Sequence, residues 1–278
     1  MSPPARKPAT RKPAARKPAA RNPAARRVPE VNRAPLLELR DVEASYGPFR
    51  SLFGMSFAVR EHGVTALLGA NGSGKTTVVR VCCGLVKPSG GHLLYQGTEI
   101  TGRRAYRLAR IGIVHAPEGR SVFSTLTVDE NLTLTFRQVF GRRGVRAALQ
   151  KAYEQFPRLG ERRKQVAGTL SGGEQRMLSL ARVLVHEPRL LITDELSLGL
   201  APVIIDEVYR TLGTIREHGT SLLIVEQHVH QALTLADDVV VMSKGRVALS
   251  GPVDELGDVS ESILPAVHGE VPTGNGAG

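Results

Sequence analysis

The sequence contains few cysteines, and the two that it has, Cys82 and Cys83, are adjacent. Adjacent cysteines cannot link distant segments, which excludes a fold held together by disulfide bonds. Scarce cysteine is typical of proteins that work in a reducing compartment. We expect both thiols in the apolar core, where free cysteine is usually found.

Long apolar segments are also absent. No run approaches the roughly 18 residues that a membrane-spanning helix needs. The N-terminus lacks the apolar stretch of a secretory signal peptide. With 278 residues, 41% of them hydrophobic, the chain is long enough for one sizeable domain and a small second one.

The excess positive charge belongs mostly to one end of the chain. Residues 1–33 hold ten Lys or Arg and one acid, whereas residues 34–278 hold 27 basic and 25 acidic residues. The net charge of +11 therefore does not indicate a nucleic-acid-binding surface on the body, which is nearly neutral.

The basic segment repeats every five residues, as ARKPA, TRKPA, ARKPA and ARNPA. A proline in each repeat forbids a continuous helix, and almost nothing larger than alanine is available to bury. We expect residues 1–33 to be a disordered tail. Its lysines and arginines suit anionic lipid or the phosphates of nucleic acid, or they are solvated without a specific partner.

From Leu36 onward, strand and helix patterns alternate. This alternation predicts a parallel sheet covered by helices, with antiparallel strands added to it. Strands are expected at 36–46, 54–63, 64–70, 110–117, 189–195 and 220–225, helices at 74–85, 174–187 and 202–219, polar helices within 127–165 broken at 141–144, and a hairpin at 236–252 that turns at Lys244 and Gly245.

A phosphate-binding loop follows the apolar run VTALL. The segment from Gly69 to Thr76, GANGSGKT, matches G-x-x-x-x-G-K-[ST] between a strand and a helix, as that motif requires. Its glycines let backbone N–H groups converge on a phosphate, and the next helix adds the positive end of its dipole. Lys75 is expected to reach the β- and γ-phosphates of a nucleotide, and Thr76 to ligate Mg²⁺.

An acidic pair, Asp194 and Glu195, ends the buried run LLITDE. Beside a phosphate loop, Asp194 is the natural partner for Mg²⁺. Glu195 is then placed to accept a proton from the attacking water.

The segment LSGGEQRMLSLARVL, residues 170–184, resembles the signature of ATP-binding cassette (ABC) ATPases. The resemblance covers about residues 36–262, and all motifs appear in that family's order. It implies an α/β fold, a P-loop NTPase cassette with a RecA-like core, an antiparallel β subdomain and an α-helical signature subdomain. The implied domain is 34–262, its helical part is about 119–187, and residues 263–278 are expected to be a disordered tail.

The resemblance also implies the ATP site. Glu195, Gln227 and Glu118 would be catalytic, and Thr76, Asp194 and Glu118 would hold Mg²⁺. Tyr46 would stack on adenine, and the signature would bind the γ-phosphate held by a second cassette, so hydrolysis requires a dimer. The implied nucleotide contacts are Tyr46, Gly69, Asn71, Gly72, Ser73, Gly74, Lys75, Thr76, Thr77, Ser171, Gly172, Gly173 and Glu174.

The stretches VHAPEGRSVFSTLTVDENL and DELSLGLAPVIIDEVY resemble the second of the two ATPases of branched-chain amino acid importers, or of urea and amide importers. This implies a homologous or identical second ATPase, transmembrane permease subunits and, indirectly, an extracytoplasmic solute-binding protein. It also implies a peripheral location on the cytoplasmic face of the cell membrane. An exporter ATPase and a soluble ABC ATPase of translation or repair are the alternatives.

Some positions depart from the general family pattern. Glu118 replaces the usual glutamine and Gly199 the usual aspartate, as in the importer relatives. Leu196 stands in place of the proline after the catalytic glutamate, and Thr193 in place of an apolar residue. These last two remove no charge or ligand, so we expect at most a looser loop after Glu195.

The strand end VEQHV carries three polar candidates, Glu226, Gln227 and His228. In most ABC ATPases a histidine at this end contacts the γ-phosphate. The spacing aligns Gln227 with that histidine, and its amide can donate to phosphate without titrating. His228 is the alternative. A metal site at His228 and His230 is disfavoured, because residues two apart on a helix do not face each other.

We expect the tail to be separate from the ATPase. Deletion of residues 1–30 should leave the rate of ATP hydrolysis by the purified chain unchanged, because no motif of the site lies there. A large loss of hydrolysis would show that the tail belongs to the catalytic unit.

Overall fold

The computed structural model describes residues 35–117, 119, 121–184, 187–256 and 263–268. The predicted basic tail, Glu118 and residues 269–278 lie outside these ranges, so predictions about them stay predictions. In the described part of the chain, no helix combines the length and the apolar character that a membrane crossing needs.

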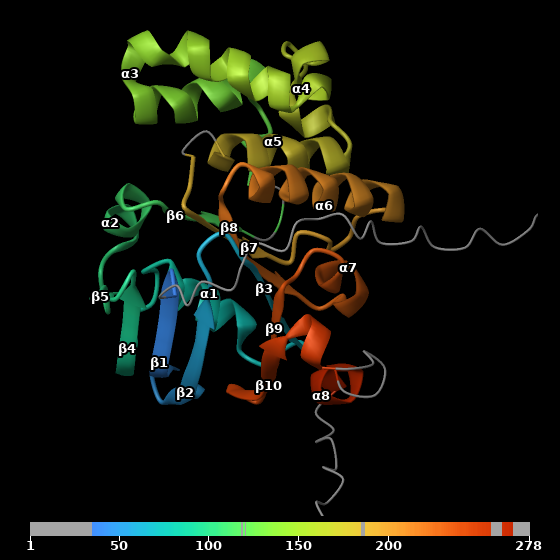
Figure 1. The fold of residues 1–278 in the computed structure, drawn as a ribbon. Helices are drawn as coiled ribbons and strands as arrows, with labels where there is room; N and C mark the ends of the chain where they lie inside the picture. The colour runs from blue at the N-terminus through green and yellow to red at the C-terminus, as the bar shows by residue number, and fades with distance from the viewer. Residues whose placement is uncertain (1–34, 118, 120, 185–186, 257–262, 269–278) are drawn as a thin grey trace, which may run out of the picture. The chain divides into compact units, whose positions relative to one another are not determined.

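A six-stranded sheet forms the centre of the body, in the order β10-β9-β3-β8-β7-β6 (Figure 1). β9, β3, β8, β7 and β6 run parallel, and β10 pairs antiparallel with β9. The β9–β10 hairpin turns at Lys244 and Gly245, as predicted. The strands are β3 Val64–Gly69, β6 Ile113–Ala116, β7 Leu190–Asp194, β8 Ser221–Glu226, β9 Asp238–Ser243 and β10 Arg246–Pro252.

Side chains along β7 and β8 alternate between the two faces of this sheet. Leu190 and Ile192 of β7 pack on one face with the first helix, α1 Lys75–Cys82, whereas Leu191 packs on the opposite face with the later helices. Because successive residues of a strand point to opposite faces, this alternation decides where the polar residues at the strand ends point.

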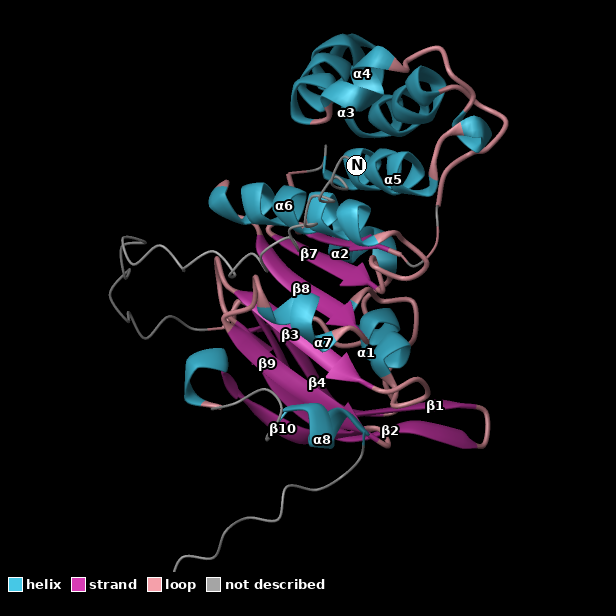
Figure 2. Ribbon diagram, turned by 90° about the vertical axis from the view of Figure 1, so that its right-hand side faces the viewer, coloured by secondary structure: helices cyan, strands magenta, loops and turns pink. Residues whose placement is uncertain are grey.

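An antiparallel sheet, in the order β2-β1-β4-β5, covers the α1 side of the core (Figure 1). Its strands β1 and β2 lie side by side in Figure 2. The strand predicted at 36–46 is confirmed; the one predicted at 54–63 lies at 49–59 instead, and the two pair with each other. This sheet consists of β1 Leu37–Tyr46, β2 Phe49–Val59, β4 Gly90–Tyr95 and β5 Thr98–Glu99.

The chain between β6 and β7 is mainly helical, and its helices lie beyond the edge of the central sheet in Figure 1. The longest of them is interrupted at Gly141, with φ 65° and ψ −177°, inside the predicted break. The helices after α1 are α2 Ala105–Arg110, α3 Val128–Gln155, α4 Pro157–Glu161, α5 Gly172–Leu184, α6 Pro202–Glu217, α7 Val229–Leu233 and α8 Leu264–His268.

The helix α8 corrects the prediction of a disordered tail from residue 263. Ile263 and Val267 are 1% and 6% exposed and pack with α7 and with β3 and β9. A spacing of four residues places both apolar side chains on one helix face, a pattern too short to stand out in the sequence.

Replacing the buried hydroxyl group of Thr193 with a methyl group is expected to stabilise the protein. Thr193 is fully buried in β7, and its Oγ1 has no hydrogen-bond partner among the residues that the structure describes. Thr193→Val should raise the free energy of unfolding by about 1 kcal/mol, because it removes a desolvated polar group and keeps the shape. Thermal unfolding measures this.

Thr220→Val is the matched control, because the buried Thr220 hydroxyl donates to the Pro188 carbonyl at 2.9 Å. It should lower the unfolding free energy by about 1 kcal/mol. Equal shifts in the two variants would contradict the interpretation of Thr193.

Candidate functional site

The phosphate loop, residues 69–76, connects β3 to α1 as predicted. A Cβ at position 69 would lie 2.6 Å from Ser73 Oγ and 2.7 Å from the Met242 carbonyl oxygen, so only glycine fits there. Gly74 precedes α1 with φ 106°, a value that side chains with a Cβ rarely adopt. These two glycines let the loop curl back over the start of α1, where its N–H groups can receive an anion.

Lys75 lies inside this loop and faces the acidic strand end. Its Nζ donates to the carbonyl oxygens of Gly69 and Ala70, at 2.9 and 3.2 Å. It also lies 3.4 Å from Glu195 Oε1, and the two side chains are 4% and 14% exposed. The structure thus brings together the predicted phosphate-binding lysine and the predicted base, from positions 120 apart in the sequence.

Asp194 ends β7 on the face that packs against α1. It follows Leu190 and Ile192 at every second position, and its side chain is 4% exposed. α1 contacts β7, and Thr76 lies in the first turn of α1. Asp194 and Thr76 therefore approach one region from two elements.

The oxygen donors of Thr76 and Asp194 suit Mg²⁺ that is bound together with a nucleotide, rather than an ion bound by protein ligands alone. In the described ranges, no group of three His, Cys, Asp or Glu side chains could hold a metal ion. Mg²⁺ in nucleotide sites commonly takes one or two carboxylates and completes its shell with phosphate oxygens and water. The hydroxyl of Thr76 and the carboxylate of Asp194 match that donor set.

Glu195 has an uncommon backbone conformation, with φ 45°. Left-handed geometry costs a residue with a Cβ about 1–2 kcal/mol, so surrounding contacts must maintain it. The Glu195 N–H donates to the Val225 carbonyl at 2.9 Å, and Arg176 donates to the Glu195 carbonyl at 3.4 Å. The next side chain, Leu196, is 1% exposed in the apolar cluster with α5 and α6, which anchors the loop that the sequence suggested would be looser.

Sequence reasoning missed Arg176 in this region and assigned no role to Glu226, one of its three candidates at the end of β8. Arg176 of α5 donates to the carbonyl oxygens of Pro117 and Gly119 as well as to Glu195, so it joins the loop around Glu118 to the acidic strand end. Glu226 is 1% exposed and accepts hydrogen bonds from Ser197. Burial raises the pKa of the Glu226 carboxyl above its ordinary value, and the hydrogen bonds from Ser197 oppose that rise.

The register of the central strands places Gln227. β8 lies between β3 and β7, with Leu68 opposite Glu226 and Asp194 opposite Val225. Continued by one residue, the β3–β8 register places Gln227 beside Gly69, whereas the β7–β8 register places Glu226 beside Glu195. Gln227 is exposed, and the alternation along β8 assigns it to the same face as Asp194. His228 is exposed as well and directly precedes α7.

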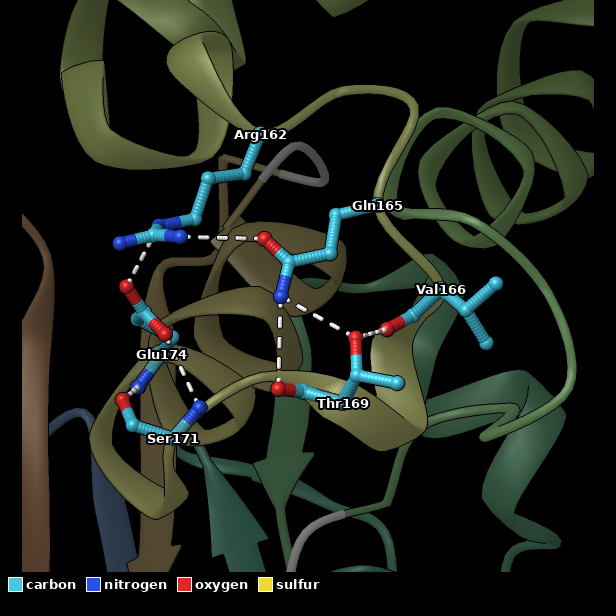
Figure 3. A network of polar contacts seen from close by, with 6 residues as sticks. All are labelled: Arg162, Gln165, Val166, Thr169, Ser171 and Glu174. Carbon is cyan, nitrogen blue, oxygen red and sulfur yellow. Dashed lines mark hydrogen bonds and ion pairs between the residues drawn. The ribbon is translucent and has the colours of Figure 1, made fainter.

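The signature residues open α5 through a reciprocal capping arrangement (Figure 3). The Ser171 N–H donates to the Glu174 carboxylate at 2.9 Å, and the Glu174 N–H donates to Ser171 Oγ at 3.3 Å. Ser171 Oγ accepts in this pair, so its hydroxyl hydrogen remains able to donate to a phosphate. The Glu174 carboxylate accepts from the backbone at the start of α5 and so stabilises this turn. Its contact with a nucleotide stays a prediction.

A second layer of polar contacts supports this turn (Figure 3). The Arg162 Nε lies 2.7 Å from Glu174 Oε1, and Arg162 also donates to the Gln165 side chain at 3.1 Å. Gln165 in turn donates to the carbonyl and hydroxyl oxygens of Thr169. Burial acts to raise the pKa of the Glu174 carboxyl, but the contacts with the Ser171 backbone and side chain and the charges of Arg162 and Arg158 bring it below its ordinary value.

The signature and the phosphate loop lie on different elements and face different neighbours. α5 packs against α3, α4, α6 and β6, whereas α1 packs against β2, β3 and β7. This separation is the geometry expected if the signature completes another subunit's site.

Tyr46 and Thr77 border the phosphate loop on the side of the antiparallel sheet. Tyr46 ends β1 with 40% of its surface exposed, and its hydroxyl accepts from Arg80 of α1 at 3.4 Å. The ring is therefore accessible for stacking beside α1. Thr77 Oγ1 lies 2.9 Å from Ser51 Oγ of β2, a contact that attaches α1 to that sheet.

Comparison with known proteins agrees with this arrangement. Residues 52–197 match the ABC transporter family. Over 214 residues, 77% of this chain and 91% of the relative, the chain is 40% identical to the high-affinity branched-chain amino acid transport ATP-binding protein BraG of Pseudomonas aeruginosa. It is 29% identical to the protein of the same description, BraF, from that bacterium, over 85% of this chain and 98% of the relative.

A solved structure confirms the fold class. The crystal structure of the ADP conformation of an ATP-binding cassette of an ABC transporter matches with a TM-score of 0.72 and 25% identity, over 80% of this chain and 92% of that chain. The predicted cassette fold and the predicted ATPase activity are thereby confirmed. The chain belongs to the family of ABC transporter ATP-binding proteins, whose cassettes hydrolyse ATP.

Proposed function

We propose that this ATPase powers the import of branched-chain amino acids or a related small polar solute. The observation that supports this proposal most directly is the 3.4 Å approach of Lys75 Nζ to Glu195 Oε1, at the end of the central sheet where β3, β8 and β7 finish. The solute class rests on the description of BraG and BraF, 40% and 29% identical to this chain, as high-affinity branched-chain amino acid transport proteins. The sequence stretches around residues 117–120 and 197–202 favour the same class over an exporter.

In this proposal each residue has a defined role. The phosphate loop binds the phosphates of ATP, and Tyr46 stacks on the adenine. Thr76 and Asp194 hold Mg²⁺, with Glu118 beside it, and the ion offsets negative charge on the phosphates. Glu195 accepts the proton of the attacking water, and Gln227 donates to the γ-phosphate.

The proposal includes partners, because one cassette holds half of each site. A second ATPase subunit presents its own Ser171-type signature to the γ-phosphate, and two ATP molecules lie between the subunits. Transmembrane permease subunits bind the pair at the cytoplasmic face of the membrane, and an extracytoplasmic binding protein delivers the solute. Without a spanning helix in its described part, the chain depends on such subunits for transport.

Glu195→Gln tests the catalytic assignment. The amide cannot accept the proton from water, so the hydrolysis rate of the purified chain should fall by about 100-fold or more, within the range of general-base contributions. ATP binding, measured by titration with a fluorescent ATP analogue, should persist. Hydrolysis at the wild-type rate would refute Glu195 as the base.

The same variant tests the transport assignment in cells. A strain that carries Glu195→Gln in place of the wild-type chain should lose uptake of radiolabelled leucine. Unchanged uptake, with accumulation of another solute inside the cells, would favour an exporter. Glu187→Gln is the matched control, because Glu187 pairs with Lys151 at the surface, away from the phosphate loop.

Separate substitutions at Gln227 and His228 test the predicted register. Gln227→Ala should lower kcat by about 10- to 100-fold, because the γ-phosphate loses a positioned donor. His228→Ala should leave kcat within about two-fold of the wild type, because His228 precedes α7 and contributes no predicted donor. Steady-state ATPase assays give both values, and the opposite ranking would transfer the role to His228.

A further inference from the structure

The carboxylate of Glu226 is the buried acidic group that the proposed mechanism leaves without a role. It ends β8 with 1% of its surface exposed. By the alternation along β8, it shares a face with Leu222 and Ile224, which pack against α5 and α6. A carboxylate removed from water in this way is costly unless hydrogen bonds satisfy it.

Ser197 supplies two hydrogen bonds to this carboxylate. The Ser197 N–H donates to Glu226 Oε1 at 3.0 Å, and the Ser197 hydroxyl donates to Oε2 at 2.7 Å. Ser197 is itself 2% exposed. Two hydrogen bonds to one carboxylate, from a backbone and a side-chain donor of the same residue, fix both the position and the orientation of that residue.

These hydrogen bonds belong to a set that surrounds Glu195. Consecutive residues of β8 hold the loop on both sides of it, because the Val225 carbonyl accepts from the Glu195 N–H and the Glu226 carboxylate accepts from Ser197. The strained φ of 45° at Glu195 lies between these two attachments. Without the second one, the loop could relax toward more favourable geometry and carry the Glu195 side chain away from Lys75.

We propose that Glu226 is a positioning residue, whose carboxylate holds Ser197 so that Glu195 faces the γ-phosphate site. This inference rests on the proposed role of Glu195 as the base. Glu226 immediately precedes Gln227, so one strand end sets both the base and the γ-phosphate donor. Glu226 acts through Ser197 and makes no contact with the nucleotide.

Three substitutions at Glu226 change its contact with Ser197 to different extents. Glu226→Ala removes it, and Glu226→Asp keeps the charge but withdraws the carboxylate by one methylene. Both should lower kcat for ATP by about 10- to 100-fold, the scale expected when a catalytic group is displaced by about 1 Å. Glu226→Gln should retain kcat within about three-fold, because its amide can accept from the Ser197 N–H and donate to the hydroxyl.

Three further measurements separate positioning from general stability. The KM for ATP should stay within about two-fold, because binding groups are untouched. Thr220→Val breaks a buried hydrogen bond just before the start of β8, at the end far from Glu226, so it should lower the melting temperature but leave kcat unchanged. In a double-mutant cycle, Glu226→Asp should cost less in a Ser197→Ala background than in the wild type.

The outcomes decide the proposal. Wild-type kcat in Glu226→Asp overturns it, and this variant remains decisive if Glu226→Ala does not fold. Losses of kcat in proportion to the folded fraction, in Glu226→Asp and Thr220→Val alike, overturn it as well. If Glu195 is not the base, Glu195→Gln will hydrolyse ATP at the wild-type rate. This result is distinguishable from a failure of the proposal for Glu226 alone.

Discussion

Three neighbouring strands, β3, β8 and β7, run parallel and end at one edge of the central sheet, and the ATP site depends on this constraint. The parallel direction brings the phosphate loop, the Gln227 position and the acidic pair to the same edge. The register then sets their order, with β8 in the middle. Lys75 and Glu195 meet across this edge at 3.4 Å although the sequence separates them widely.

Successive residues of a strand point to opposite faces of the sheet, so the polar residues at this edge fall into two groups. Asp194 and Gln227 fall on the face of α1, where the phosphates are proposed to bind. Thr193 and Glu226 fall on the opposite face, against the helices α5 and α6. Polar groups on that face cannot contact the nucleotide, so any function they have must act through the loop that follows β7.

Several buried polar groups here are satisfied mainly by backbone atoms. Lys75 donates to two loop carbonyls, and Arg176 to the carbonyls of Pro117, Gly119 and Glu195. The Lys75 bonds close its own loop, whereas the Arg176 bonds connect segments distant in the chain and fix the relative position of two loops. The signature turn follows the same principle through Ser171 and Glu174, with Arg162 as an added charge.

The sequence by itself determined the motifs, the strand-and-helix order and the antiparallel addition, because glycine geometry, apolar periodicity and short polar motifs are local properties. It also predicted the break near Gly141 and the turn at Lys244. Only the tertiary structure decided that Glu226 points inward to Ser197, that Arg176 joins two loops, and that residues 263–268 form a packed helix. Those facts depend on which sheet face a residue meets and what packs there, which no local pattern specifies.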